Sequence, residues 1–239
     1  MTLGRWAAWP LAVLLALSPG LALTAAGSDE AAGRDAIDQI KKVEDAIRVL
    51  EEMMKESDKS IPESLIKDCA GIAIIPDVIR AGLIIGGRHG RGVVLVRTGN
   101  GGWSDPAFID LKGGSIGWQA GVQSADVILV FRTPRSIENI TGGKFTLGAD
   151  AGIAAGPLGR SAEASTDAEL KAEILSYSRS RGLYVGLTLQ GSSIQEDRKA
   201  NRDFYGGEIT PKDIFAGRAK MTPDVVAKLK SALSGLVKK

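Results

Sequence analysis

The pattern of apolar positions divides the chain into a helical first part, a central run of strands and a helical last part. In residues 35–59, apolar side chains recur every three or four positions, which predicts an amphipathic helix. Pro62 stands where proline is favoured in a first helical turn, so a short second helix is expected up to about Cys69. Helical spacing returns at residues 195–204, 210–215 and 223–236.

After Cys69 the period changes to short, β-branched apolar runs separated by glycines, Asn-Gly and Asp-Pro, which is typical of strands joined by tight turns. A helix is expected only at residues 135–140, after Pro134. A glycine-dense stretch at 142–159 and a closing hairpin at 174–190 add further strands. The first six expected strands are residues 72–75, 83–85, 93–96, 107–111, 116–122 and 127–131.

These strands follow one another too closely for crossover helices, so their sheet is expected to be mainly antiparallel. The turn at Asn100-Gly101-Gly102 is a strong hairpin signal. Glycine at many strand positions indicates a sheet that bends sharply. We therefore predict an α+β fold: a single domain with a curved, barrel-like, glycine-rich and mainly antiparallel sheet, flanked by N- and C-terminal helices.

Residues 1–26 have the order of a secretory signal peptide: a single positive charge at Arg5, an apolar run, and small residues up to Ala26. We expect cleavage after Ala26 or Gly27. An uncleaved anchor is the alternative, but the apolar run is shorter than the ~20 residues needed to span a bilayer. The sequence therefore predicts an exported protein, periplasmic or secreted, that is peripheral at a membrane.

Composition and charge exclude several classes of function. With 30 basic and 28 acidic residues, the net charge of +2 gives no general reason to bind nucleic acid. The single Cys69 and single His89 exclude an intrachain disulfide, multi-cysteine zinc sites and two-histidine metal motifs, and no cofactor is expected. Carboxylates such as Asp105, Asp110 and Asp126 are not paired by spacing, so no enzyme activity is predicted.

The glycine-rich run from Gly86 to Gly92 contains Arg88 and Arg91 and is expected to join two apolar strands. One interpretation is an anion cradle, in which backbone N–H groups and two guanidiniums contact a phosphate. The other is an ordinary glycine turn whose polar side chains face water. The run lacks the Gly-Lys-Ser/Thr ending of a P-loop.

Two helices are candidates for membrane contact. The first carries eight acidic and five basic residues, so an anionic membrane would repel it and packing against the domain is favoured. The last, within residues 218–239, has four lysines against one aspartate from Thr222 onward. It could lie on an anionic bilayer or cover the sheet, and docking is slightly favoured.

An ordered series of motifs lies at residues 71–76, 81–88, 92–94, 102–107, 113–121, 126–130, 148–150, 155–160, 177–183 and 201–206. Together these motifs resemble the SYLF domain, a lipid-binding module known also from yeast actin-patch proteins. The resemblance covers residues 35–217 and implies a non-enzymatic domain that binds membrane lipids, notably phosphoinositides, and in some fungal members actin filaments.

We therefore expect an exported SYLF-like protein of the cell envelope whose partner is an anionic membrane lipid. The alternative is a protein-interaction module that binds an envelope protein through a sheet edge or the last helix. Neither nucleic acid nor actin is expected as a partner of an exported chain. The predicted headgroup contacts are Arg88, Arg91, Lys228 and Lys230, and the predicted acyl contacts are Ile40, Ile47, Leu50 and Met54.

Overall fold

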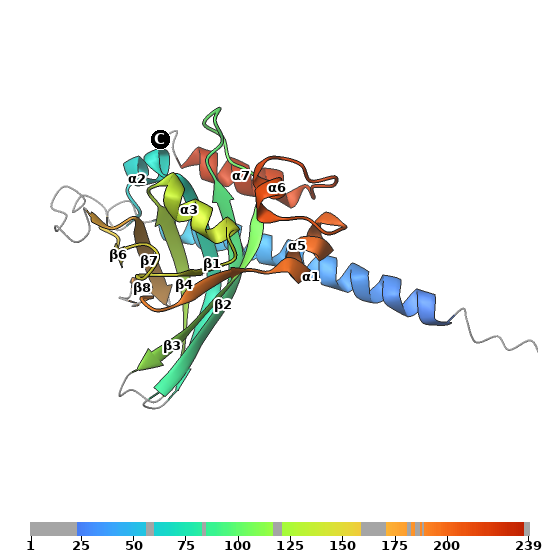
Figure 1. The fold of residues 1–239 in the computed structure, drawn as a ribbon, viewed down its shortest axis with the longest axis horizontal. Coiled ribbons are helices and arrows are strands. Elements are labelled where there is room, and N and C mark those ends of the chain that lie inside the picture. The colour runs from blue at the N-terminus through green and yellow to red at the C-terminus, as the bar shows by residue number, and fades with distance from the viewer. Residues whose placement is uncertain are drawn as a thin grey trace, which may run out of the picture.

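The computed structural model describes residues 23–55, 60–82, 85–116, 121–158, 171–180, 183–184, 187 and 189–236. These residues form a mixed α+β fold in which helices flank a strongly curled sheet (Figure 1). The predicted fold class is therefore confirmed. The predicted signal peptide lies outside the described residues, except that residues 23–26 form the start of the first helix.

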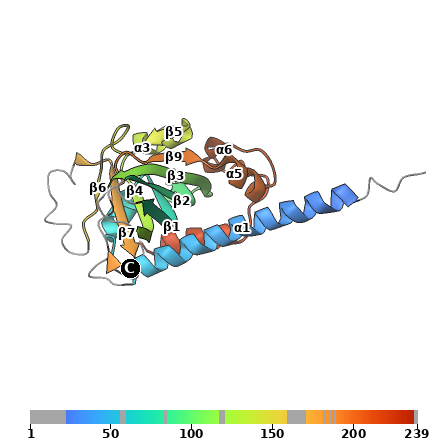
Figure 2. The same ribbon diagram turned by 90° about the horizontal axis from the view of Figure 1, so that it is seen from below.

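The sheet has nine strands among the described residues, in the order β5-β9-β3-β2-β1-β4-β7-β6, with β8 paired to β7. Every pairing is antiparallel except that of β6 with β7. Seen from below, the strands curl into a half-barrel (Figure 2). The strands are β1 Gly71–Gly82, β2 Ile85–Val96, β3 Ala107–Ile116, β4 Gly121–Phe131, β5 Lys144–Thr146, β6 Ile153–Ala155, β7 Ile174–Ser180, β8 Leu183–Tyr184 and β9 Ser193–Glu196.

Most helices begin where the sequence predicts them. Proline occupies the first turn of α3 and α6, and a threonine side chain caps each of these helices. The first helix differs from the prediction, because it begins at Leu23 and ends at Met54. The helices are α1 Leu23–Met54, α2 Glu63–Asp68, α3 Pro134–Thr141, α5 Arg198–Tyr205, α6 Pro211–Phe215 and α7 Val225–Gly235.

The two faces of the half-barrel are covered differently. Helix α3 contacts β4, β5 and β9, and its Ile137 side chain lies against Gly71 of β1, so α3 fills the concave inner face. Helices α1, α5 and α7 pack together along the outer face (Figures 1 and 2). Phe204 of α5 meets Phe108 of β3 edge to face, with ring centroids 5.0 Å apart. The core therefore has an inner and an outer layer.

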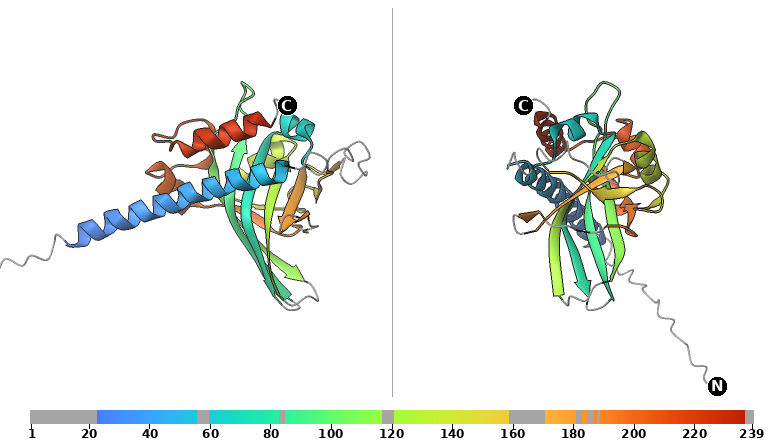
Figure 3. Two further views of the ribbon diagram at one scale, coloured as in Figure 1. Left: turned by 180° about the vertical axis from the view of Figure 1, so that it is seen from behind. Right: turned by 90° about the vertical axis from the view of Figure 1, so that its left-hand side faces the viewer.

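The six short strands expected between residues 72 and 131 are four long strands. The run from Gly86 to Gly92 is not a turn but lies inside β2, with β1 paired on one side and β3 on the other. This corrects the prediction. A β-bulge in β1 bends the strands, with Asp77 in the left-handed region at φ 48° and its N–H donating to Asp126 Oδ1 over 3.0 Å. The far ends of β1–β4 extend beyond the helices (Figure 3).

Candidate functional site

Arg88 and Arg91 lie on opposite faces of β2, because side chains alternate along a strand. Arg88 is opposite Arg80 of β1 and Gly113 of β3, on the inner face. Arg91 is opposite Asp110 of β3, on the outer face. The structure therefore does not bring the two predicted headgroup contacts into one anion cradle.

Arg91 is held in an ion-pair cluster around Asp110. Its Nε lies 3.3 Å from Asp110 Oδ1 and 4.0 Å from Asp197 Oδ2. Lys112 Nζ lies 3.1 Å from the other oxygen of Asp110, and His89 Nε2 lies 3.8 Å from Oδ1. The charge of Arg91 is thus balanced within the protein, although its side chain is half exposed.

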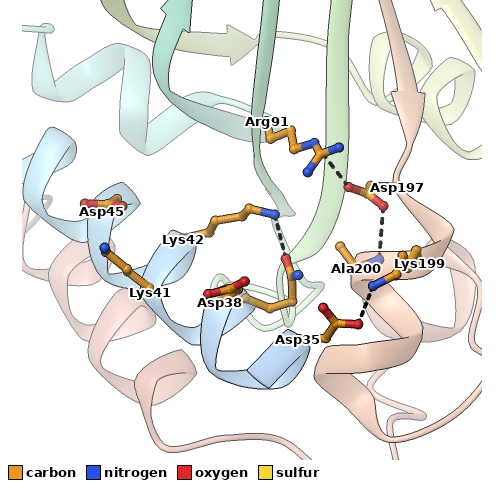
Figure 4. Close-up of a pocket in the computed structure, with 10 residues that line it drawn as sticks. Asp35, Asp38, Lys41, Lys42, Asp45, Arg91, Asp197, Lys199 and Ala200 are labelled. Carbon is orange, nitrogen blue, oxygen red and sulfur yellow. Dashed lines mark hydrogen bonds and ion pairs between the residues drawn. The ribbon is translucent and has the colours of Figure 1, made fainter. Parts of the chain in front are cut away.

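A groove of about 340 Å³ between α1, β2 and α5 contains Arg91 (Figure 4). Burial lowers the pKa of Lys42, and the nearby charge of Arg91 lowers it further. Lys199 of α5 joins the helices, with Nζ 2.6 Å from Asp35 and 2.8 Å from Asp203. Four acidic and four basic side chains line this groove, so it has no net charge: Asp35, Asp38, Asp45, Asp197, Lys41, Lys42, Arg91 and Lys199.

The predicted lysine contacts lie on α7, whose apolar side docks on the domain. Leu229 and Leu233 are fully buried, and α7 packs along α1. Lys230 Nζ lies 2.6 Å from Asp105 Oδ1, an ion pair that fastens α7 to the segment before β3. Lys228 is exposed. Of the helix expected within residues 218–239, the described part is Val225–Gly235, which packs against the protein.

The predicted acyl contacts lie on the face of α1 that packs against the sheet. Leu50 is fully buried, and Ile40, Ile47 and Met54 are half-buried against the core. These side chains contact protein in this conformation and are not open to acyl chains. Among the α1 side chains that the structure describes, Ile37 is a large apolar one that is exposed, at 64%.

A second polar site, which the sequence analysis missed, lies on the inner face. One row of this face crosses four adjacent strands and contains Gln123 of β4, Arg80 of β1, Arg88 of β2 and Gly113 of β3. Arg80 and Gln123 line a groove of about 780 Å³, which also contains Val122 of the outer face. Ser192 lies against Gly113. A charged residue between apolar neighbours in a strand, as in Ile79-Arg80-Ala81, is the signal that could have identified Arg80, because it lies on the opposite face from those neighbours.

The outer face of the same sheet end is apolar. Ile79 is 49% exposed and Val122 is 75% exposed. Their strands are paired, with Ala81 directly opposite Val122 and Ile79 one step further along the same face. This sheet end therefore has cationic groups on one face and exposed apolar groups on the other.

Within the part of the chain that the structure describes, no group of three or more His, Cys, Asp or Glu side chains could hold a metal ion. No helix in that part combines the length and the apolar character needed to cross a membrane.

The fold and these two sites define an α+β domain whose curled sheet exposes a different chemistry on each face. A family model described as "Ysc84: Las17-binding protein actin regulator" matches residues 112–236. The chain belongs to this family, the Ysc84 or SYLF family, as its motifs predict.

Relatives are similar over most of this chain. The chain is 38% identical to LAS seventeen-binding protein 3 of Saccharomyces cerevisiae over 172 residues, which cover 71% of this chain and 37% of that protein. It is 35% identical to the human SH3 domain-containing YSC84-like protein 1 over 182 residues, 75% of this chain and 53% of that protein. The chain thus spans about half or less of the length of these relatives.

Proposed function

We propose that this protein is a non-enzymatic module that binds an anionic lipid surface through the far end of strands β1–β4. The observation that carries the proposal is the exposure of Ile79 and Val122 on the outer face of a sheet end whose inner face holds Arg80 and Arg88. Apolar side chains beside cations are the combination that a bilayer with anionic headgroups attracts.

The location differs from the one that the sequence favoured. The acyl contacts predicted on α1 are packed, whereas Ile79 and Val122 are exposed on strands that extend beyond the helices (Figure 3). Fully burying an apolar side chain of this size contributes about 1.5–3 kcal/mol. Two such side chains, with basic groups at the headgroup level, contribute to reversible binding at a membrane surface.

Replacing Ile79 and Val122 together by glutamate is expected to weaken binding to anionic vesicles at least tenfold, because it removes two apolar contacts and adds charges that the surface repels. Co-sedimentation with vesicles of phosphatidylcholine and phosphatidylglycerol measures this. A matched control replaces Ile37 and Met221, which are also exposed apolar residues but lie outside the sheet, by glutamate. Equal losses in both double variants would contradict the proposed surface.

A fluorophore attached at Val122→Cys is expected to shift its emission to the blue when anionic vesicles are added. The native Cys69 does not interfere, because it is only 4% exposed and burial raises the pKa of its thiol, which keeps it unreactive. The same label at Met221→Cys should not shift. No shift at Val122 on vesicles that bind the protein would show that another surface contacts the membrane.

A second candidate function is a protein-interaction module. The family description names a Las17-binding actin regulator, and a yeast relative is named as a LAS seventeen-binding protein. The chain spans only part of these relatives. Las17 binding therefore belongs either to the domain that they share with this chain or to the rest of the relatives' length. A protein that sediments with no vesicle of any composition would favour this second function.

We also propose that the protein is exported, on the basis of the signal-like order of residues 1–26. The expected result is that the mature protein lacks these residues, which intact-mass measurement of protein from its native source would detect. Retention of the segment would support the alternative, an uncleaved anchor.

A further inference from the structure

The inner face of the sheet end changes character in regular steps away from the core. Val78, Gly90 and Ala125 form a buried row next to the core. The next row contains Arg80, Arg88, Gln123 and Gly113, and the row after that contains three glycines. The polar row therefore lies between packed apolar residues and a row made of three glycines and Ser115. The three glycines are Gly82, Gly86 and Gly121.

Two guanidiniums are adjacent in this polar row. Arg80 and Arg88 are directly opposite each other in the β1–β2 ladder, where side chains on one face lie about 5 Å apart at Cβ. Arg88 is only 8% exposed. Burial lowers the pKa of Arg88, and the charge of Arg80 lowers it further. The row thus holds two like charges side by side.

The neighbours of the arginines on the inner face are small or polar. Glycine at the next row puts no side chain above the guanidiniums on the inner face. Gly113 lies opposite Arg88. Its lack of a side chain leaves room for Ser192, because a Cβ atom at this position would collide with the serine. The Ser192 hydroxyl is fully buried and has no hydrogen-bond partner among the described residues.

The wall of the adjoining groove also contains carboxylates. Asp77 and Asp126 lie at the β-bulge, nearer the core than the arginine row. Asp126 Oδ1 accepts the N–H of Asp77, and Ser124 Oγ donates to Asp77 Oδ1 over 3.3 Å. These carboxylates hold the bulge together.

We propose that the row of Arg80, Arg88, Gln123 and Ser192 is a binding site for a phosphate group. Two guanidiniums offer charge-assisted hydrogen bonds to its oxygens, and an amide and a hydroxyl complete the set of donors. The groove of about 780 Å³ has room for the group that carries the phosphate. The identification of this group as a membrane lipid rests on the proposed function. The donors of the row themselves suit any phosphate ester.

Arg80→Gln and Arg88→Gln are each expected to weaken phosphate binding at least tenfold. The test titrates the full chain with inorganic phosphate and with glycerol 3-phosphate, following the arginine Nε–H resonances by NMR. Arg91→Gln is the matched control, because it removes the same charge from the other face of the same strand. Arg80 is only half-buried, so Arg80→Gln keeps the test valid if Arg88→Gln fails to fold. Equal binding in Arg80→Gln and Arg91→Gln would overturn the site.

Vesicles of phosphatidylcholine with and without phosphatidic acid separate the two sources of phosphate. Loss of phosphatidic acid binding in Arg80→Gln, with Arg91→Gln unchanged, supports a lipid headgroup at the row. Loss of glycerol 3-phosphate binding alone supports the row as a site for a free phosphate ester and counts against a lipid headgroup as its ligand. If vesicle binding depends on Ile79 and Val122, and Arg80→Gln changes neither vesicle binding nor glycerol 3-phosphate binding, the membrane function stands and the phosphate site is wrong.

Discussion

Replacing Phe204 by alanine is expected to lower the free energy of unfolding by about 3–5 kcal/mol. The Phe204 ring is 2% exposed and lies between two other rings, with centroids 5.0 Å from Phe108 and 4.9 Å from Tyr205. It packs α5 against the outer face of β3, next to the hydrogen bond from the Phe108 N–H to Asn201 Oδ1. Its removal leaves a cavity and breaks two edge-to-face pairs. Urea unfolding followed by circular dichroism measures the change.

Phe215→Ala is the control for this prediction. Phe215 at the end of α6 is half-buried against the same core, so its truncation exposes less new apolar surface and should cost clearly less. Phe204→Leu, which keeps most of the volume, should cost about 1.5 kcal/mol or less. Similar losses for Phe204→Ala and Phe215→Ala would show that the outer layer is not packed around Phe204.

Gly92→Ala is expected to destabilise the protein by about 3 kcal/mol. A Cβ atom at this position would collide with the backbone of Ile74 and Ile75, where β1 bends at its bulge. Backbone atoms held in a paired strand cannot move aside as the end of a side chain can. Thermal and urea unfolding of the variant measure the loss.

Gly87→Ala is the matched control on the same strand. A Cβ atom at Gly87 would meet nothing within 4 Å, so alanine there should leave stability unchanged or raise it by about 0.5 kcal/mol through the unfolded state. If residues 86–92 formed a free turn, the two variants would behave alike. A difference of at least 2 kcal/mol is therefore expected only if β2 is continuous.

Elements with local signals could be predicted from the sequence. Pro134 and Pro211 stand in the first turns of α3 and α6, where the missing N–H costs nothing. The Asn100-Gly101 turn forms as expected, with the Gly101 N–H donating to Thr98 O over 2.9 Å. Each of these signals acts within a few residues of the chain.

The glycine run in β2 could not be assigned in the same way. Glycine has low strand propensity, and the hydrogen bonds that make residues 86–92 a strand come from β1 and β3. The opposite orientation of Arg88 and Arg91 follows only once that pairing is known. Pairing with β1 and β3 therefore determines both that residues 86–92 form a strand and that Arg88 and Arg91 lie on opposite faces.

Long-range ion pairs hold other predicted contact residues and their helices in place. Lys230 pairs with Asp105, and Lys199 joins α5 to Asp35 of α1. Nothing in the local pattern around Lys230 indicates this partner. Ser192 likewise reaches the arginine row only because β9 pairs with β3. The inner-face row thus combines residues that the sequence keeps far apart.

The alternation of side chains along β2 also determines where the chain can change in length. A residue inserted between Arg88 and Gly92 would turn Arg88 to the outer face and bring its neighbour into the inner row, exchanging the two chemistries. The turn at residues 98–102 lies beyond the last paired residue, so an insertion there leaves every strand in register. Insertions and deletions among functional homologues should therefore be absent from β2 and concentrated in its connecting turn.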